Sequence, residues 1–200
     1  QRNFEFVDDV KVLTVKDGVY TFPGIAWNEV YYKINGSTQH IFGCTPAFGL
    51  GGVSIAVIDP VSLLPYRHGD TASTQYANGV LNCVPSNPIQ YLNAFDFTDV
   101  DQTNRDYMRD FLDSIPNGHY VLVYSQYIHK NTIYDANLLN ALQSIGASPA
   151  GGGGGVVQDT LPWIVWGVKG AGSGQEVVGT LASQYIYLTD TFQTNWFTGY

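Results

Sequence analysis

The sequence predicts an α+β domain in which two packed, mostly antiparallel β-layers carry two amphipathic helices. Short apolar or alternating runs, which are typical of strands, recur through the first half of the chain. From Asp101, and again from Asp135, the apolar period changes from two to 3.6, which is typical of a helix lying on a sheet. At 200 residues, with 44% hydrophobic and 13% charged, the chain suits one domain or one and a half.

The first part of the chain reads as a meander of short strands separated by the turn signals Asp17-Gly18 and Asn35-Gly36. The expected strands are FEFV, VKVLTV, GVYTF, NEVYYKI and QHIFG. A buried strand, VSIAVIDP, follows and ends at Asp59-Pro60, where a tight turn sends the chain back. We therefore expect residues 1–45 to pack as additional strands on a core domain at 46–200.

The second part of the chain contains both predicted helices. Residues 69–90 form a long polar excursion, and the strand YLNAFDF returns the chain to the core. One face of the first helix carries Tyr107, Met108, Phe111, Leu112 and Ile115, and this helix ends at Pro116 and Gly118. After the strand YVLVY, Asp135 caps the second helix, Leu138, Leu142 and Ile145 face inward, and Gly146 is its C′ residue. The last expected strands are PWIVWGVKG, EVVGTL and SQYIYL.

Charge and composition exclude several kinds of partner. The net charge is -8, the pI is about 4.6, and the nine Lys and Arg form no basic run, which argues against a nucleic acid partner. No run of about 18 apolar residues predicts a membrane span, and no signal peptide is recognisable in this stretch. Few Lys and many Tyr, Gly, Asn, Thr and Ser are typical of extracellular β-rich modules, so we expect a secreted or cell-surface location.

The two cysteines, Cys44 and Cys83, permit one disulfide, which we expect in an oxidising compartment. Such a bond would tie the polar excursion to the beginning of the core. The alternative is two buried thiols.

The sequence shows no local signature of a metal or cofactor site. The four histidines, His40, His68, His119 and His129, have no partner at metal-ligand spacing, and neither cysteine belongs to a CxxC motif. The glycines at 151–155 lack the Lys-Ser/Thr and the helix start of a phosphate-binding loop, which favours a loop over a nucleotide site. We expect no metal and no cofactor.

Candidate catalytic residues are equally sparse, because Ser54 and Ser125 lack the Gly-x-Ser-x-Gly elbow of an activated nucleophile. Asp96, Asp99 and Asp101 precede a helix, where the helix dipole accounts for acidic residues better than glycosidase chemistry does. We expect no enzymatic activity. The rival hypothesis is a hydrolase that uses Asp96 with His129, which requires the two side chains to meet in one pocket.

Five stretches, in this order, resemble the interleukin-like EMT-inducer domain, also called the GG domain. They are GGVSIAVIDPVSLLPY, FDF, SIPNGHYVLV, QSIGAS and WIVWGVKG, and they span about residues 50 to 175. Similar modules occur in large surface proteins of the type IX secretion system, including gingipain-like sortase relatives. The resemblance implies a non-catalytic extracellular accessory module that gives protein-protein docking or scaffolding within a larger protein.

The resemblance also leaves a carbohydrate-binding module as the alternative, since the same fold binds sugar in the stem of a mannose-modifying glycosyltransferase. The family's KDEGS stretch corresponds here to Tyr127-Ile128-His129-Lys130-Asn131, and its GWRD stretch survives only as Asp159. Most of the acid and arginine positions that would grip a glycan are therefore lost, which favours a plain strand end at 127–131 and a protein partner or a neighbouring domain. If a sugar binds, the expected ligand residues are Tyr127, His129, Lys130, Asp159, Trp163 and Lys169. In the strand PWIVWGVKG, Trp163 and Trp166 are three residues apart and so face opposite sides of the sheet.

Overall fold

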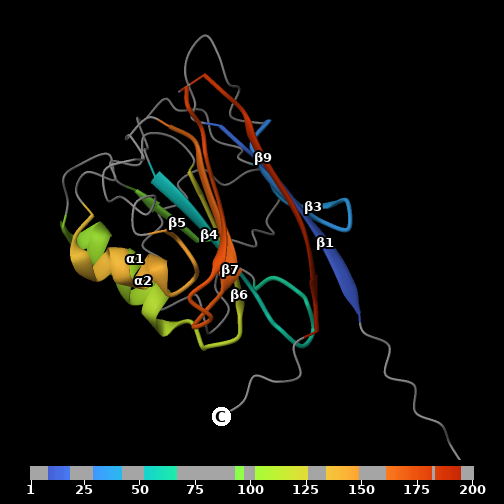
Figure 1. The fold of residues 1–200 in the computed structure, drawn as a ribbon, viewed down its shortest axis with the longest axis horizontal. Coiled ribbons are helices and arrows are strands. Elements are labelled where there is room, and N and C mark those ends of the chain that lie inside the picture. Colours follow the sequence, from blue (N-terminus) through green and yellow to red (C-terminus); the bar gives the residue numbers. More distant parts are fainter. Residues whose placement is uncertain are drawn as a thin grey trace, which may run out of the picture.

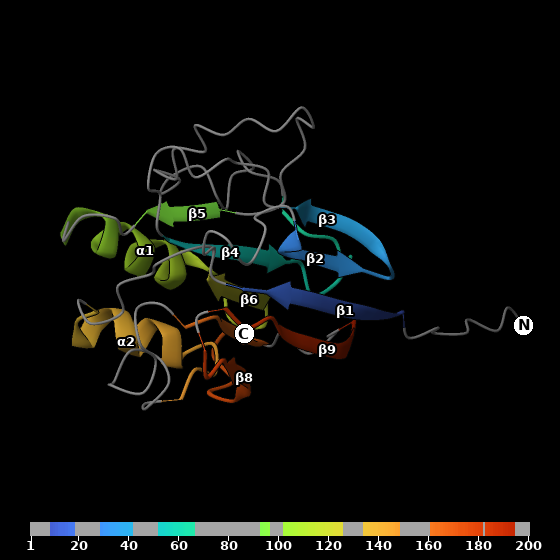
Figure 2. The same cartoon turned by 90° about the horizontal axis from the view of Figure 1, so that it is seen from above.

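The structure is a computed structural model that describes residues 9–18, 29–41, 52–66, 93–96, 102–125, 134–148, 161–181 and 183–194. These residues form three layers. Two helices cover one face of a five-stranded sheet, and a four-stranded sheet lies against the other face (Figures 1 and 2). This arrangement confirms the predicted α+β fold with two packed β-layers.

The four-stranded sheet, sheet A, has the strand order β3-β2-β1-β9. Its strands are β1 (Val10–Asp17), β2 (Tyr31–Ile34), β3 (Ser37–Ile41) and β9 (Ile186–Gln193). The five-stranded sheet, sheet B, has the order β5-β4-β6-β7-β8. Its strands are β4 (Gly52–Ile58), β5 (Asn93–Asp96), β6 (Tyr120–Ser125), β7 (Trp163–Val168) and β8 (Gly174–Val178). The strand pairs in the described part of the chain are all antiparallel.

Sheet A joins the two ends of the chain. β1 pairs with β9 along its whole length, from Val10 opposite Gln193 to Asp17 opposite Ile186. The division expected near residue 45 falls between β3 and β4, that is, between the two sheets. However, β9 comes from the C-terminal part and completes the sheet that the N-terminal strands begin.

The Asn35-Gly36 signal forms the hairpin that the sequence predicts between β2 and β3. Both residues have positive φ, 49° and 77°, as the two central residues of a type I′ turn require. The Asn35 side-chain oxygen also accepts a hydrogen bond from the backbone N–H of Val12 in β1, at 2.8 Å. The turn is therefore tied to the neighbouring strand as well as closing its own hairpin.

The strands of sheet B are apolar on both faces because both faces are covered. In β4, Val53, Ile55 and Val57 pack beneath the helices, whereas Ala56 and Ile58 pack against sheet A. β7 alternates in the same way, with Trp163 on the helix side and Trp166 on the side of sheet A. This confirms that the two tryptophans face opposite sides.

The helices α1 (Gln102–Ser114) and α2 (Ala136–Gln143) begin and end close to where the sequence predicts. The Asp135 carboxylate caps α2 by accepting from the Leu138 backbone N–H at 2.9 Å. At the other end, Gly146 has a φ of 102°, and backbone hydrogen bonds run from Ala147 to Leu142 and from Gly146 to Gln143. These two bonds are those of a Schellman motif, so Gly146 has the predicted role.

The end of α2 packs directly on the β7–β8 hairpin, and glycines make this approach possible. A Cβ on Gly167 would collide with the carbonyl oxygen of Ile145, and a Cβ on Gly146 would collide with the backbone of Gly174. The glycines of the predicted strand and of the α2 end therefore serve helix–sheet packing. Among the described residues, no helix has the length and apolar character that a membrane crossing needs.

Candidate functional site

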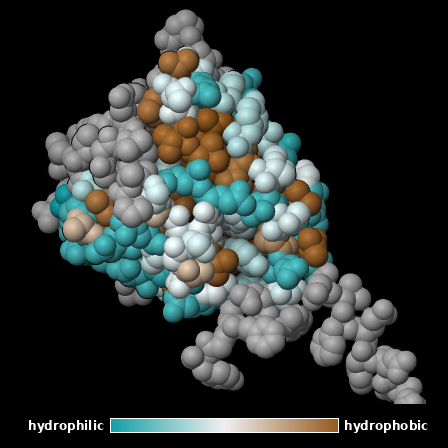
Figure 3. All heavy atoms as spheres, viewed as in Figure 1, coloured by the Kyte–Doolittle hydropathy of each residue, from teal (hydrophilic) through white to brown (hydrophobic). Residues whose placement is uncertain are grey.

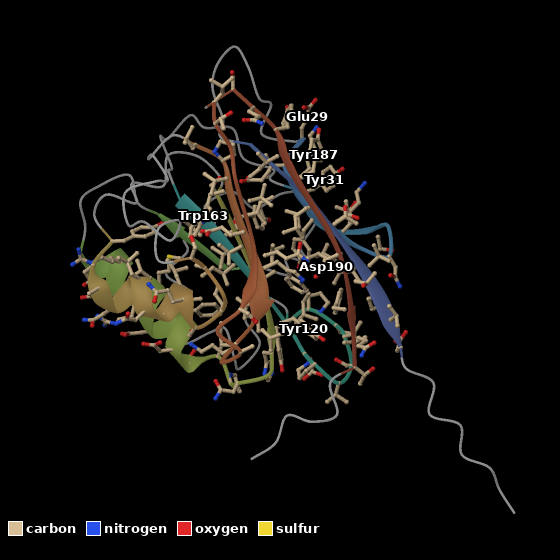
Figure 4. All side chains as sticks on the ribbon, in the orientation of Figure 1. Glu29, Tyr31, Tyr120, Trp163, Tyr187 and Asp190 are labelled. Atoms are coloured by element: carbon tan, nitrogen blue, oxygen red, sulfur yellow. The ribbon has the colours of Figure 1, made fainter. Side chains whose placement is uncertain are left out.

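An open hollow of about 320 Å³ lies at the seam between the two sheets. We call it the aromatic hollow. It is lined by Tyr120, Trp166, Gly167, Val168, Ser173, Gly174, Gln175 and Asp190. The residues come from β6, β7, β8, β9 and the turn before β8, so both sheets contribute to its walls. Figure 4 shows Tyr120 and Asp190 on the side of sheet B that faces sheet A, with Trp163 on the opposite side.

The aromatic side chains of the hollow hold one another in place. The Tyr120 and Trp166 rings are stacked, with centroids 5.5 Å apart and an angle of 12° between their planes. Phe192 packs edge-on against both rings, at 5.2 and 5.4 Å. The Tyr120 hydroxyl donates to the carbonyl oxygen of Gln193 at 2.7 Å, which fixes the far end of that ring.

Asp190 supplies the negative charge of the hollow. It lies in β9 at an inward-facing position, between the buried residues Leu188 and Phe192. Its Oδ2 atom accepts a hydrogen bond from Trp166 Nε1 at 2.9 Å. A carboxylate has about four acceptor sites, so this single bond leaves most of its capacity available to a ligand.

The outer face of sheet A is a second candidate surface, which we call the tyrosine platform. It is a row across three strands in which Lys16 of β1 lies between Tyr31 of β2 and Tyr187 of β9. Tyr187 is 59% exposed, and further along β1 Val10 and Val12 are 49% and 39% exposed. Figure 4 shows Tyr31 and Tyr187 together on the outer side of sheet A, near Glu29.

Charged side chains border the tyrosine platform. Lys16 Nζ lies 3.8 Å from the centroid of the Tyr185 ring and 3.5 Å from the Glu29 carboxylate. The Tyr185 hydroxyl donates to the same carboxylate, and this bond, followed by the charge of Lys16, holds the pKa of Glu29 below its usual value. Lys33 Nζ lies 4.4 Å above the Tyr31 ring. The platform is therefore aromatic with cations at its centre and edge.

A buried polar cluster ties sheet A to sheet B, and we call it the Asp17 cluster. Asp17, at the end of β1, has no exposed surface, and its Oδ2 accepts from Ser125 Oγ at 2.7 Å and from the Trp163 backbone N–H at 3.1 Å. Its Oδ1 atom is buried without a hydrogen-bond partner. Burial raises the pKa of Asp17 from 3.8 to about 7, although the hydrogen bonds from Ser125 and Trp163 oppose the shift.

The Asp17 cluster resembles a catalytic serine–carboxylate pair only in its residue types. Ser125 is also fully buried, so no substrate reaches its hydroxyl in this fold. Tyr124 lies nearby, and burial together with the charge of Asp17 raises its pKa further above the usual range. The cluster links sheet A to sheet B through these buried hydrogen bonds.

Asp59, Tyr66 and His119 form a third polar group, at a turn beside sheet B. Tyr66 Oη lies 3.1 Å from Asp59 Oδ2, to which it donates, and 3.0 Å from His119 Nε2. Although burial raises the pKa of Asp59, the amides of Ser62 and Val61 and the Tyr66 hydroxyl hold it below its usual value. Because Asp59 Oδ1 already accepts from the Val61 and Ser62 N–H groups, this carboxylate organises the turn after β4.

Trp163 lies in the core beneath the helices, where its side chain is only 1% exposed. Its Nε1 donates to Glu176 Oε1 at 2.7 Å. A ring enclosed in this way presents no face to a sugar, so the stacking role expected of Trp163 does not fit its position.

Lys169 is also buried, just beyond the other end of β7. Its Nζ donates to Ser144 Oγ at 2.8 Å and lies 3.8 Å from the Asp113 carboxylate, near the C-terminal ends of both helices. Burial lowers its pKa, and Asp113 opposes that shift. Because six residues of extended chain span roughly 20 Å, a single sugar ring would not reach both Lys169 and Trp163.

The other predicted residues lie outside the described part of the chain. These are Tyr127, His129, Lys130 and Asp159, together with Cys44 and Cys83 of the expected disulfide. The backbone of Asp96 is described and lies opposite Gly52 at the end of β5. The hydrolase that would use Asp96 with His129 therefore stays a hypothesis. Among the described residues, no group of three or more His, Cys, Asp or Glu could hold a metal ion.

The sequence interpretation missed the hollow because its walls combine β6 with the β7–β8 hairpin of sheet B and with β9 of the other sheet. One signal was nevertheless present. Asp190 stands at an inward-facing position of an alternating strand, where an apolar residue is expected. The same is true of Asp17, which follows Leu13 and Val15 on the buried face of β1.

The fold and these surfaces define the class of protein, a three-layer domain of helices and two sheets with an open hollow at the seam between the sheets. No protein-family model matches the chain, and no curated protein matches it significantly.

Proposed function

We propose that this chain is a non-catalytic extracellular module that docks a protein partner, or a neighbouring domain, within a larger cell-surface or secretion-system protein. The observation that carries the proposal is the tyrosine platform. Tyr187, Val10 and Val12 expose apolar surface on the outer face of sheet A, and Tyr31 lies in the same row as Tyr187, on the other side of Lys16. Aromatic residues that combine an apolar ring with a polar tip are enriched at protein interfaces.

The position of the platform supports docking. Both faces of sheet B are covered, but the described helices lie on the far side of sheet B from sheet A, so they do not cover the platform (Figures 1 and 2). β9 forms one edge of sheet A, because within the sheet it pairs only with β1. On the face seen in Figure 1, hydrophobic side chains gather in the upper centre of the view, and hydrophilic side chains lie directly below them (Figure 3). An interface around β9 would combine these surfaces.

Two further considerations support a role without catalysis. The serine and carboxylate of the Asp17 cluster are closed to substrate, and the Asp59 carboxylate is occupied by the amides of its own turn. The order of segments that resembles the GG domain also implies an accessory module.

Site-specific photo-crosslinking tests the docking function. A photoreactive amino acid replaces Tyr187 in the full-length protein in its own cells, and a matched control replaces Leu64, which has a similar exposure of 62% against 59%. We expect a discrete protein adduct from position 187, absent from position 64 and lost when Tyr31→Ser is added. Equal labelling at the two positions, or no adduct at 187, would contradict docking through the platform.

A carbohydrate-binding module is the second candidate, because the platform also suits sugar stacking. Tyr31 and Tyr187 lie on either side of β1, roughly 10 Å apart across two strand spacings, a span comparable to two linked sugar rings. A glycan array with wild type and Tyr187→Ala separates the two functions. Micromolar binding that Tyr187→Ala abolishes without unfolding the protein would favour the sugar function, and a blank array would remove its support.

A further inference from the structure

The aromatic hollow has a charge that its own lining does not balance. Among the described residues that line the hollow, Asp190 is the only acidic or basic one, and its only hydrogen-bond donor there is the indole N–H of Trp166. The other polar side chains of this lining are the hydroxyl groups of Tyr120 and Ser173 and the amide of Gln175.

The cations on adjacent elements are engaged elsewhere. On β1, Lys11 forms an ion pair with Asp9 at 2.8 Å and Lys16 one with Glu29 at 3.5 Å. Lys169, which follows β7, directs its Nζ to Ser144. The chain as a whole carries a net charge of -8. The potential in the hollow therefore favours a cation that comes from outside.

The shape of the hollow suits a cation attached to a flat or slender group. Trp166 and Phe192 are each only 3% exposed, so the partly exposed Tyr120 ring is the aromatic surface beside the carboxylate, and it is held rigid by stacking on Trp166 and by edge-on packing with Phe192. A basic group gains both from a carboxylate and from an aromatic ring, and a rigid wall loses little conformational entropy when it binds.

We propose that the aromatic hollow binds a basic side chain, with arginine as the best fit, from the protein that docks on this module. The proposal rests on the docking function above and names the chemistry of the partner. Tyr187 and Asp190 lie three residues apart on opposite faces of the edge strand β9, so a partner that wraps around β9 reaches both. Arginine fits best because its guanidinium plane donates to a carboxylate and stacks on a ring at once.

A titration followed by NMR tests the proposal directly on the isolated protein. The probe is N-acetyl-arginine amide, and the matched control is N-acetyl-citrulline amide, which has the same shape without the charge. The reporter is the indole Nε1–H resonance of Trp166, assigned with Trp166→Phe. We expect saturable shifts with the arginine probe and at least about tenfold weaker binding of the citrulline probe, the ratio that losing one charge-assisted bond predicts.

Two variants locate the binding. Asp190→Asn keeps an acceptor for the Trp166 indole and should weaken arginine binding at least about tenfold. Asp110→Asn on α1 makes the same change in net charge far from the hollow and should leave binding unchanged. Equal effects of the two variants would mean that only net charge matters, and equal binding of the two probes would mean that the charge is irrelevant; either result overturns the proposal.

The same assay separates this proposal from the two functions above. If methyl glycosides shift the Trp166 indole resonance and the arginine probe does not, the hollow is a sugar site and the proposal is wrong. If neither ligand shifts it while the crosslink at position 187 persists, protein docking stands and only the basic anchor is removed.

Discussion

The two faces of sheet B are buried by different chemistry. The helix side is packed with aliphatic residues and with Met108, Phe111 and Trp163. The Trp163 indole donates to Glu176 on the edge strand β8. On the side that faces sheet A, Ser54 is a fully buried polar residue of sheet B, and Asp17, from the inward face of sheet A, accepts a hydrogen bond from the buried Ser125 at the end of β6.

The comparison shows that the two faces of one sheet can differ in how their contribution to stability depends on pH. Burial of apolar side chains stabilises the fold at every pH, because those side chains do not titrate. A buried carboxylate makes the stability of its interface depend on protonation. The hollow opens on the same side of sheet B as the Asp17 cluster, so the side with buried polar groups is also the side with ligand-binding potential.

The helix side gives the largest expected effect. Phe111 is fully buried between α1 and sheet B, so Phe111→Ala should lower the free energy of unfolding by about 3–5 kcal/mol, through lost burial and a cavity. Urea denaturation measures this loss, which should be the same at acidic and at neutral pH. Tyr187→Ala on the outer face is the control and should change stability by no more than about 0.5 kcal/mol. A loss at Phe111 that varies with pH would break the contrast between the two faces.

The sheet side should give a pH dependence that the helix side lacks. Because the pKa of Asp17 rises from 3.8 to about 7 on folding, the folded state binds more protons than the unfolded state within that window. The contribution of Asp17 to the free energy of unfolding therefore falls as pH rises from about 4 to about 7, by up to about 4 kcal/mol at 1.36 kcal/mol per pKa unit.

Asp17→Asn isolates this effect from the other carboxylates. The amide oxygen of Asn can still accept from Ser125 and from the Trp163 N–H, but it does not ionise. We expect the variant to be more stable than wild type above pH 7 and to lose that advantage towards pH 4. Stability measured by denaturation across this range would contradict the assignment if the two profiles ran parallel.

The fold was predictable from local patterns because each element carries its own signal. Asn35-Gly36 specifies its hairpin, Asp135 and Gly146 specify the ends of α2, and the period change separates helices from strands. What local patterns could not supply was the pairing of β1 with β9, because the sequence contains no signal that joins positions so far apart. This pairing builds sheet A, and with it the platform.

The candidate site was harder to predict for the same reason. The chemical types of Trp163 and Lys169 predict ligand residues, but both side chains are buried in the fold. Asp17 was interpreted as part of a turn signal, and Asp190 was not selected. Their inward register in alternating strands is the physical signal, since a carboxylate in such a position requires a partner or a shifted pKa.

The smallest expected effect concerns one hydrogen bond of the Asp17 cluster, the bond between Ser125 and Asp17. Ser125 donates its hydroxyl to Asp17 Oδ2, a bond that is stronger when the carboxylate is ionised. Ser125→Ala should therefore cost about 1.5–3 kcal/mol above pH 7 but only about 0.5–1.5 kcal/mol near pH 4, where the carboxyl group is protonated. The variant should also raise the pKa of Asp17 further, because it removes one of the bonds that oppose the effect of burial.

Denaturation at the two pH values measures both costs, and in an Asp17→Asn background the difference between them should vanish. A cost that stays equal at both pH values in the wild-type background would show that Ser125 contributes by packing and that Asp17 is not the titrating group of this interface.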